Sequence, residues 1–339
     1  DQKDDQMSAM ARQDTQSSSG GIGQGYKSSA GGRSPLDRPL VLMLIVGSFL
    51  GVSTVFAKAA PEIGWHPIAL LQWSILGGAI GLFGATRLAG LKNGSTRVAK
   101  EKGHQQRLVI YILITGLLFI LPNMIAVAAA PRVGAGFVAL CFAFPLVLTY
   151  AFAVVLRLQR FQWIMGAGVF FGVAGGILLA ISGSELSAEA SFWSLLALAI
   201  PLFLAAGNIY RTLKWPKGAK PVDLALGMMV VGFLVLSAFT ATWGIPVAPV
   251  AWTPEAAGLL AAQTAIFGLQ YGLYFRLQQT AGPVYLSQIG SVAAVVGLGL
   301  GYLVFNEVPN AAKLAAVAAV GVGIILVTVG QRRVWQSTD

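Results

Sequence analysis

The sequence predicts an all-α polytopic membrane protein, with ten transmembrane helices arranged as two inverted five-helix (5+5) repeats. Three observations support this prediction. First, hydrophobic residues make up 56% of the 339 residues and charged residues only 11%, whereas soluble domains carry roughly 25% charge. Second, the apolar residues gather into runs of the ~20 residues that cross a bilayer. Third, the pattern of Gly136–Ile181 returns 148 positions later, in Val284–Val329.

The chain divides into a polar tail and two repeats. Residues 1–36 are rich in Ser, Gly, Gln and Asp and contain almost no large apolar residue, so we expect a disordered tail that cannot build a core. The first five-helix repeat is predicted over residues 37–184. The second is predicted over residues 190–333.

Ten apolar spans follow the tail. Each is long enough to cross the hydrocarbon core as a helix. An even number of spans places both termini on the same side of the membrane. The predicted spans cover residues 39–60, 67–88, 108–129, 133–156, 161–182, 191–213, 222–244, 255–276, 283–305 and 310–331.

The basic residues are distributed unevenly between the two sides of these spans. All but three of the 23 Lys and Arg residues fall on the side of the termini, and the exceptions are Lys58, Arg132 and Lys313. Because cytoplasmic loops carry the excess of Lys and Arg, both termini are predicted to be cytoplasmic, in a multi-pass protein of the cell (inner) membrane. The net charge of +10 therefore sets orientation and does not indicate a nucleic-acid partner.

The internal repeat rests on pattern more than on identity, since six of the 46 aligned positions are identical. Spans four and five align with nine and ten, spans three and eight align at the same shift, and spans one and six align at a shift near 153. Because five spans is an odd number, the second half enters the membrane inverted. This is the plan of many secondary transporters.

The residues around span four and the end of the chain resemble a known family. A small-residue run precedes span four, Pro145 lies within it, and the last hairpin reads NEVPNAAKLAAVAAVGVGIILV. These features resemble the EamA domain of the drug/metabolite transporter (DMT) superfamily, over roughly residues 37–333. The resemblance implies two EamA halves and transport of small metabolites, often export. The family commonly has Glu at the hinge of each half; Glu307 matches, whereas Gln159 departs from the pattern.

The ionisable residues lie near the ends of the spans. No carboxylate falls near a span centre, where charge is costly and usually functional. An embedded proton carrier is therefore not predicted, which favours facilitated diffusion or exchange. Coupling at the rim remains open, with Glu307 and Lys58 as candidates. Lys58 is expected to snorkel outward, and Arg211 ends span six at the inner face; either would attract anionic solutes if it pointed inward.

Neutral polar residues within the spans are the candidate substrate-binding residues. Buried amides need partners, which are either solute and water in a cavity or neighbouring helices. Asn123 and Tyr271 are 148 positions apart, and Gln263 and Gln270 are seven apart on one helix face. The alternative of a tie between helices is stronger for Gln72 and Asn208. The candidates are Asn123, Gln263, Gln270, Tyr271, Gln72, Trp73, Asn208 and Tyr150.

These features predict a transporter, with export favoured, of small organic metabolites such as amino acids, working by alternating access around a central cavity. The alternatives are a proton-coupled multidrug or metabolite exporter and a non-transporting membrane sensor or scaffold. An enzyme is not predicted, because His66 and His104 lie in opposite loops and no catalytic cluster accompanies them. We expect no metal and no cofactor. The expected partners are the solute and the lipid bilayer, and the sequence does not separate monomer from homodimer.

Overall fold

The helices begin where the sequence supplies helix-starting residues. The computed structural model describes residues 39–92, 104–157, 160–182, 188–216, 218–308 and 311–336. Five of the described α-helices start on proline: α2 (Pro39–Ala59), α3 (Pro67–Lys92), α6 (Pro145–Val155), α10 (Pro221–Thr242) and α11 (Pro254–Phe305). Proline suits the first position because its fixed φ matches the helix and its missing N–H would have no partner there. The predicted tail, residues 1–36, lies outside the described residues.

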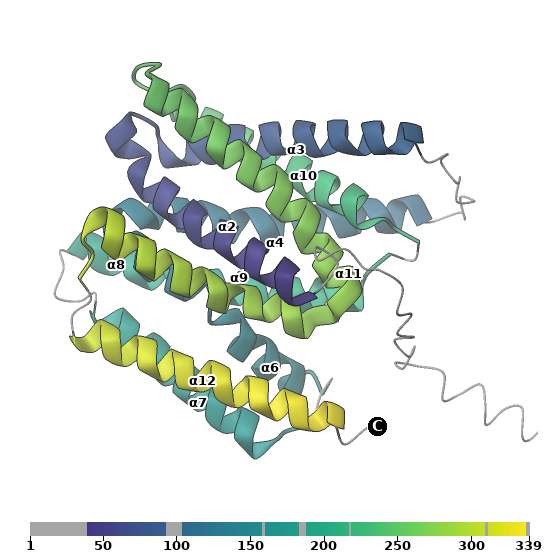
Figure 1. The fold of residues 1–339 in the computed structure, drawn as a ribbon, viewed down its shortest axis with the longest axis vertical. Helices are drawn as coiled ribbons and strands as arrows, with labels where there is room; N and C mark the ends of the chain where they lie inside the picture. Colours follow the sequence, from purple (N-terminus) through teal and green to yellow (C-terminus); the bar gives the residue numbers. More distant parts are fainter. Residues whose placement is uncertain are drawn as a thin grey trace, which may run out of the picture. The chain divides into compact units, whose positions relative to one another are not determined.

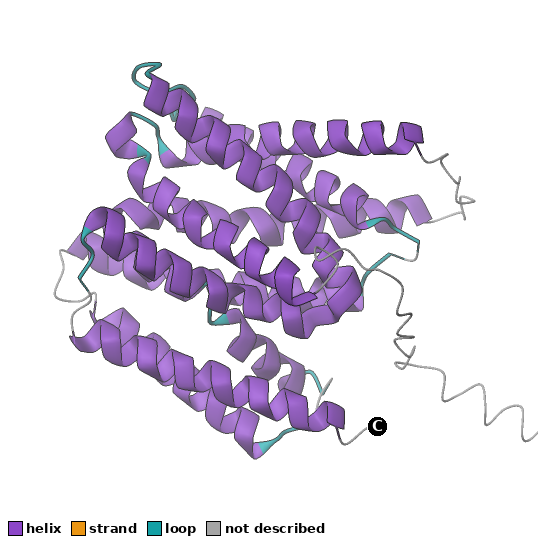
Figure 2. Cartoon of the chain, viewed as in Figure 1, coloured by secondary structure: helices purple, strands orange, loops and turns teal. Residues whose placement is uncertain are grey.

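Every regular element of the described residues is a helix (Figure 2), which confirms the all-α class. A 3₁₀ turn, Pro61–Ile63, joins α2 to α3. The remaining helices are α4 (His104–Val133), α5 (Ala135–Cys141), α7 (Trp163–Ser182), α8 (Ala188–Ala197), α9 (Ile200–Leu213) and α12 (Ala311–Gln336).

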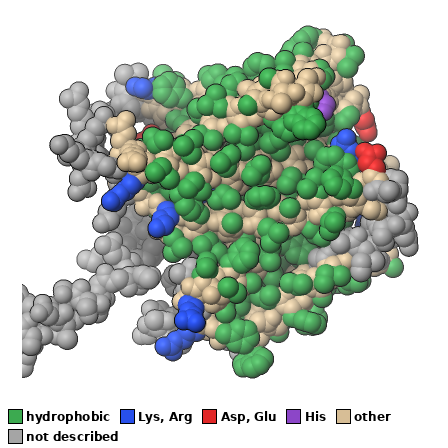
Figure 3. All heavy atoms as spheres, turned by 180° about the vertical axis from the view of Figure 1, so that it is seen from behind, with side chains coloured by type: hydrophobic (Ala, Val, Ile, Leu, Met, Phe, Trp, Pro, Cys, Tyr) green, Lys and Arg blue, Asp and Glu red, His purple; other side chains and the backbone are tan. Residues whose placement is uncertain are grey.

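Eight stretches among the described residues are long and apolar enough to cross a membrane. Figure 3 shows one face covered by hydrophobic side chains, with charged side chains gathered at its two edges. Large apolar side chains such as Ile80, Leu234 and Leu303 are more than half exposed. A face on which large apolar side chains predominate and charged ones stay at the edges fits lipid rather than water. The chain is therefore a multi-pass integral membrane protein.

The structure corrects the predicted boundary between spans eight and nine. Residues 255–276 and 283–305 were expected as separate spans, but α11 is one helical run of 52 residues. A straight helix of that length would measure about 78 Å, more than twice the hydrocarbon core. Figure 1 shows that α11 turns back on itself. The turn contains Gly282 and Pro283, residue types at which helices bend without ending.

Contacts with α2 show the same reversal. The first part of α11 runs antiparallel to α2, because Gln263 lies near Thr54 whereas Leu277 packs with Leu42. The second part runs parallel to α2, from a contact of Ile289 with Gly47 to the pairing of Glu307 with Lys58. Helix α2 thus lies against both arms of α11.

Two predicted spans are interrupted in the membrane. Span four consists of α5 and α6, separated at Phe142–Phe144, and span six consists of α8 and α9, separated at Leu198–Ala199. Pro145 and Pro201 occupy the first turns that follow. Proline cannot donate the N–H that a continuous helix requires, and so each break falls just before it. Interrupted backbone at membrane depth is tolerated where it is buried in protein or lines a cavity.

Candidate functional site

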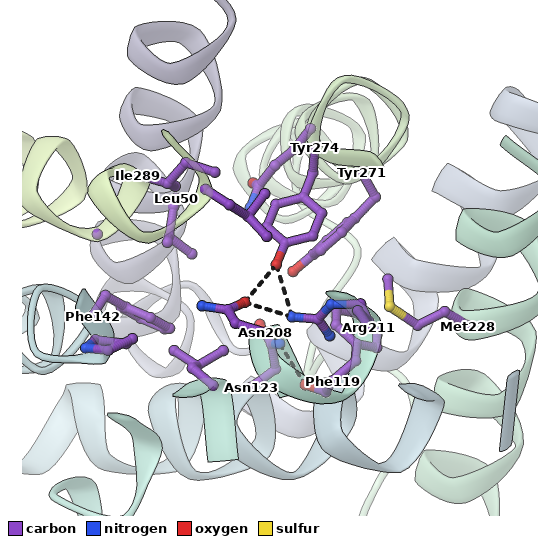
Figure 4. Close-up of a pocket in the computed structure, with 15 residues that line it drawn as sticks. Leu50, Phe119, Asn123, Phe142, Asn208, Arg211, Met228, Tyr271, Tyr274 and Ile289 are labelled. Carbon is purple, nitrogen blue, oxygen red and sulfur yellow. Dashed lines mark hydrogen bonds between the residues drawn. The ribbon is translucent and has the colours of Figure 1, made fainter. Parts of the chain in front are cut away.

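A cavity of about 60 Å³ lies among α2, α4, α6, α9, α10 and α11. It has room for several waters, since one water needs about 10–15 Å³ measured this way. Six polar residues line it: Asn123, Asn208, Arg211, Gln270, Tyr271 and Tyr274. Most of the remaining wall is apolar, with Leu50, Phe119, Phe142, Met228, Leu286 and Ile289 among its members (Figure 4). A largely apolar wall with a few convergent polar groups is typical of small-molecule sites.

Arg211, Asn208 and Tyr274 form a hydrogen-bonded group on one wall of the cavity (Figure 4). Arg211 Nη2 donates to Asn208 Oδ1 and to the Tyr274 hydroxyl, both at 2.8 Å. The Tyr274 hydroxyl in turn donates to Asn208 Oδ1 at 3.2 Å. Asn208 and Arg211 share a helix face because they are three residues apart on α9. The arginine side chain is 3% exposed.

The other polar residues that line the cavity, Asn123, Gln270 and Tyr271, are neutral. Asn123 Nδ2 donates to the Phe119 carbonyl oxygen at 2.7 Å, one helical turn earlier on α4. Tyr271 packs edge-on against Phe119, with ring centroids 4.7 Å apart. Gln270 is buried, and no described residue donates to its Oε1. An unpaired buried acceptor costs free energy unless water or a ligand supplies a donor.

A smaller cavity of about 20 Å³ adjoins the first and shares Leu50, Asn123 and Phe142 with it. Gln263 lines this second space together with Ser53 and Thr54. The Oε1 of Gln263 also has no partner among the described residues. Gln263 and Gln270 therefore face neighbouring parts of one interior region, as expected from their spacing of seven.

Three of the predicted site residues lie away from both cavities. Gln72 donates to Ser237 Oγ at 3.1 Å and accepts from Thr240 Oγ1 at 3.0 Å, so it ties α3 to α10. Trp73 Nε1 donates to the Val247 carbonyl oxygen. The Tyr150 hydroxyl accepts from the main-chain N–H of Gln162. The structure thus brings together Asn123, Gln263, Gln270, Tyr271 and Asn208, and leaves Gln72, Trp73 and Tyr150 outside.

The two candidate rim residues meet each other instead of the cavity. Lys58 in the last turn of α2 forms an ion pair with Glu307, which follows α11. The same carboxylate accepts the main-chain N–H groups of Ala135 and Gly136, at 2.9 and 3.0 Å. These are the first residues of α5, where a negative charge is favourable. Glu307 therefore joins α2, α5 and the end of α11.

Arg211 and Tyr274 are polar cavity residues outside the list of candidates, although an inward-pointing Arg211 was predicted to attract anionic solutes. Arg211 was expected at the inner membrane face, because it lies in the last turn of its span. The usable signal was its spacing of three from Asn208, which puts both side chains on one face. Tyr274 lies one turn after Gln270 on α11, and the same rule would have added it.

Comparisons with known proteins show a shared fold and assign no family. No family model matches the chain. No curated protein matches it. Among 27 matching chains of solved structures, one described only as "Crystal structure of protein" is 18% identical, covers 89% of this chain and 100% of its own, and has a TM-score of 0.55. The chain is a polytopic, all-helical membrane protein that shares its fold with this solved structure.

Proposed function

We propose that the protein transports small organic metabolites such as amino acids, in the direction of export, by alternating access around the central cavity. The observation that supports this most strongly is the composition of the cavity wall. Residues of α2, α4 and α6 from one predicted half face residues of α9, α10 and α11 from the other. A solute site between two halves is where rocking motions expose it first to one side and then to the other.

The ten-span inverted repeat belongs to the same proposal, and paired glycine contacts support it. A Cβ built on Gly168 would lie 2.8 Å from the Gly323 carbonyl oxygen. One built on Gly175 would lie 3.0 Å from the Ala316 carbonyl oxygen. The shift of 148 converts Gly168 into Ala316 and Gly175 into Gly323. The two contacts are therefore each other's counterparts when the halves are exchanged, as a two-fold axis between α7 and α12 requires.

Phe142 and Gly290 provide a second sign of such an axis. They are 148 positions apart, and Gly290 packs directly against the Phe142 carbonyl oxygen. A residue touches its own repeat counterpart only close to a symmetry axis. Both residues also line the cavity. The proposed axis thus passes beside the proposed solute site.

The proposed orientation has both termini in the cytoplasm of a cell (inner) membrane. Arg87 and Arg107, at the far ends of α3 and α4, lie on the predicted cytoplasmic side, and Lys58 and Arg132 lie on the other. Charged side chains at the two edges of the apolar face are consistent with this arrangement (Figure 3). The positive-inside rule then assigns the more basic edge to the cytoplasm.

Facilitated diffusion or exchange is the mode that the site supports best. No carboxylate occurs among the described residues that line the two cavities. Glu307, the rim candidate for proton coupling, is paired with Lys58. The resemblance to EamA-domain transporters supports solute transport without specifying coupling.

Counterflow in proteoliposomes tests the proposal. Vesicles that contain the full chain are loaded with a pool of unlabelled amino acids and small organic acids, and the same solutes are added outside with label. Transient accumulation of label without a pH gradient is expected from an exchanger or facilitator. The absence of counterflow for every solute, with protein that remains folded, would contradict transport of this class.

A further inference from the structure

We propose that Arg211, supported by Asn208 and Tyr274, binds a carboxylate group of the transported solute. The inference rests on the proposed function and names the chemical class of solute that the cavity accepts. It concerns a buried cation whose partners in the structure are neutral.

The charge of Arg211 has no counter-ion among the described residues. Two ion pairs in the structure join Lys58 to Glu307 and Arg132 to Glu189, and neither includes Arg211. Among the described residues, Arg211 donates to two neutral acceptors, Asn208 Oδ1 and the Tyr274 hydroxyl. A buried charge of this kind costs free energy unless it is paired. Residues of this kind within membrane segments usually mark solute or ion sites.

The guanidinium also has at least one N–H donor without an acceptor among the described residues. Arginine has five N–H donors, and no described residue accepts from Nε of Arg211. Carboxylates pair with two parallel N–H groups of arginine, which adds geometric specificity to the attraction. The Asn208 and Tyr274 hydrogen bonds hold the guanidinium at the cavity wall, since both come from residues that line the same cavity.

The proposed internal repeat accounts for the missing counter-ion of Arg211 among the described residues. Lys58 and Arg211 occupy related positions, 153 residues apart, in the last turns of α2 and α9. Lys58 is neutralised by Glu307 from the other half. The residue 148 positions before Glu307 is Gln159, which is uncharged. The carboxylate that the repeat would supply to Arg211 is therefore missing from the sequence.

The other residues that line the cavity indicate what the solute carries besides its carboxylate group. One positive charge balances one carboxylate, whereas a doubly charged group would leave excess charge in a low-dielectric site. Phe119, Phe142 and Met228 offer an apolar surface to the body of the solute. The Oε1 of Gln270 can accept one N–H or O–H group. An organic cation finds no carboxylate here, which separates this site from one built for cationic drugs.

The test compares three solutes of similar shape: phenylacetate, its neutral amide phenylacetamide, and the cation phenethylammonium. Exchange of each is measured in proteoliposomes of the full chain. The wild-type protein is expected to prefer phenylacetate over phenylacetamide by about tenfold or more, the scale of one charge-assisted interaction. Arg211→Gln is expected to reduce the ratio to about one, whereas Arg211→Lys keeps part of it because the charge remains.

Lys214→Gln is the matched control, because it removes the same charge from the same end of α9 at an exposed position outside the cavity. It is expected to keep the wild-type preference. If Arg211→Gln does not fold, the ratio of phenylacetate to phenylacetamide exchange is measured instead in Arg211→Lys and in Tyr274→Phe. Tyr274→Phe removes only the hydroxyl group that bonds to Arg211. An unchanged ratio in either would overturn the assignment.

The outcomes separate this inference from the proposed function. Exchange of all three solutes without preference, or with a preference that survives Arg211→Gln, overturns the carboxylate site and leaves transport standing. If phenylacetate fails to exchange whereas the amide or cation does, only the carboxylate site is overturned. If none exchanges and the counterflow experiment also fails, both are overturned.

Discussion

Lys58 in α2 and Glu307 after α11 form an ion pair across the two predicted halves of the protein, at positions 249 residues apart. Both side chains are about four-fifths buried, with exposures of 19% and 20%. Glu307 also caps α5 through the N–H groups of Ala135 and Gly136. One carboxylate thus contacts three helix ends. Its removal should therefore lower the free energy of unfolding of the whole helix bundle.

Glu307→Gln is expected to destabilise the protein by about 1.5–3 kcal/mol, the range for hydrogen bonds to charged groups. Thermal unfolding in detergent measures the loss. A double-mutant cycle with Lys58→Gln should reveal coupling between the two sites. The Arg132→Gln and Glu189→Gln variants serve as controls, because that ion pair is largely exposed and should contribute no more than about 1 kcal/mol. Equal effects of the two pairs would contradict the structural role of Glu307.

Gly290→Ala should prevent correct folding. A Cβ at this position would collide with the Phe142 carbonyl oxygen, and main-chain atoms cannot yield as a flexible side chain can. Size-exclusion chromatography of the solubilised protein should show loss of the monodisperse species. Gly299→Ala on the same helix is the control, since nothing lies within 4 Å of its added Cβ; it should be neutral or stabilise by up to about 1 kcal/mol. Normal folding of Gly290→Ala would show that α5 and α11 pack differently.

Gln72 and Gln270 should respond to alanine in opposite ways. Gln72→Ala removes two hydrogen bonds between α3 and α10, so it should lower stability by about 1–3 kcal/mol and leave solute affinity unchanged. Gln270→Ala removes an unpaired cavity acceptor and should weaken exchange while stability stays the same or rises. Melting temperature and exchange rate, measured on the same preparations, separate the two. The reverse pattern would move the solute site toward α3.

His66 should make the protein less stable in acid. Burial, followed by the positive charge of Arg132, lowers the pKa of this histidine below its ordinary value of 6.5. Its Nδ1 accepts the Ile68 N–H at the start of α3, which only neutral imidazole can do. Because the folded pKa is the lower one, the unfolded state binds more protons, so stability is complete above the ordinary pKa and falls as pH drops through the folded value.

Thermal unfolding between about pH 7.5 and pH 5.5 measures this effect, across the range in which histidine titrates. His66→Asn is the control, because asparagine accepts at a helix start and does not titrate. The variant should lose the part of the pH dependence that arises from His66. If its pH profile matched that of the wild type, His66 would not be the source.

The sequence was sufficient for the class of fold but not for the continuity of α11 or the break before Pro201. Hydrophobic runs predicted the multi-pass helical architecture, because a bilayer leaves helices few alternatives. The sequence predicted separate spans over residues 255–276 and 283–305, whereas α11 is continuous through both. Whether the chain contains ten spans in two inverted repeats stays a prediction, supported by the exchangeable contacts of Gly168 and Gly175.

The candidate site could be predicted only in part, because the polarity of a residue does not show in which direction its side chain points from the helix. Asn123 and Gln72 are both buried amides. One lines the cavity and the other bonds to α10, a difference that depends on helix rotation. The orientation of Arg211 could not be predicted for a related reason, since an arginine at the end of a span can also reach outward to the interface. Its inward orientation depends on Tyr274, 63 residues away.

Alternating access around the cavity is the central claim, and accessibility of a single cysteine tests it most directly. The chain has one cysteine, Cys141, which is buried, so Cys141→Ser provides a background without thiols. Leu50→Cys then places a thiol where both cavities meet, and Leu234→Cys places one on the exposed apolar face. Membrane-impermeant reagents are added to oriented vesicles from either side. The proposal predicts that Leu50→Cys is labelled from both sides and Leu234→Cys from neither; labelling of Leu50→Cys from one side only would contradict it.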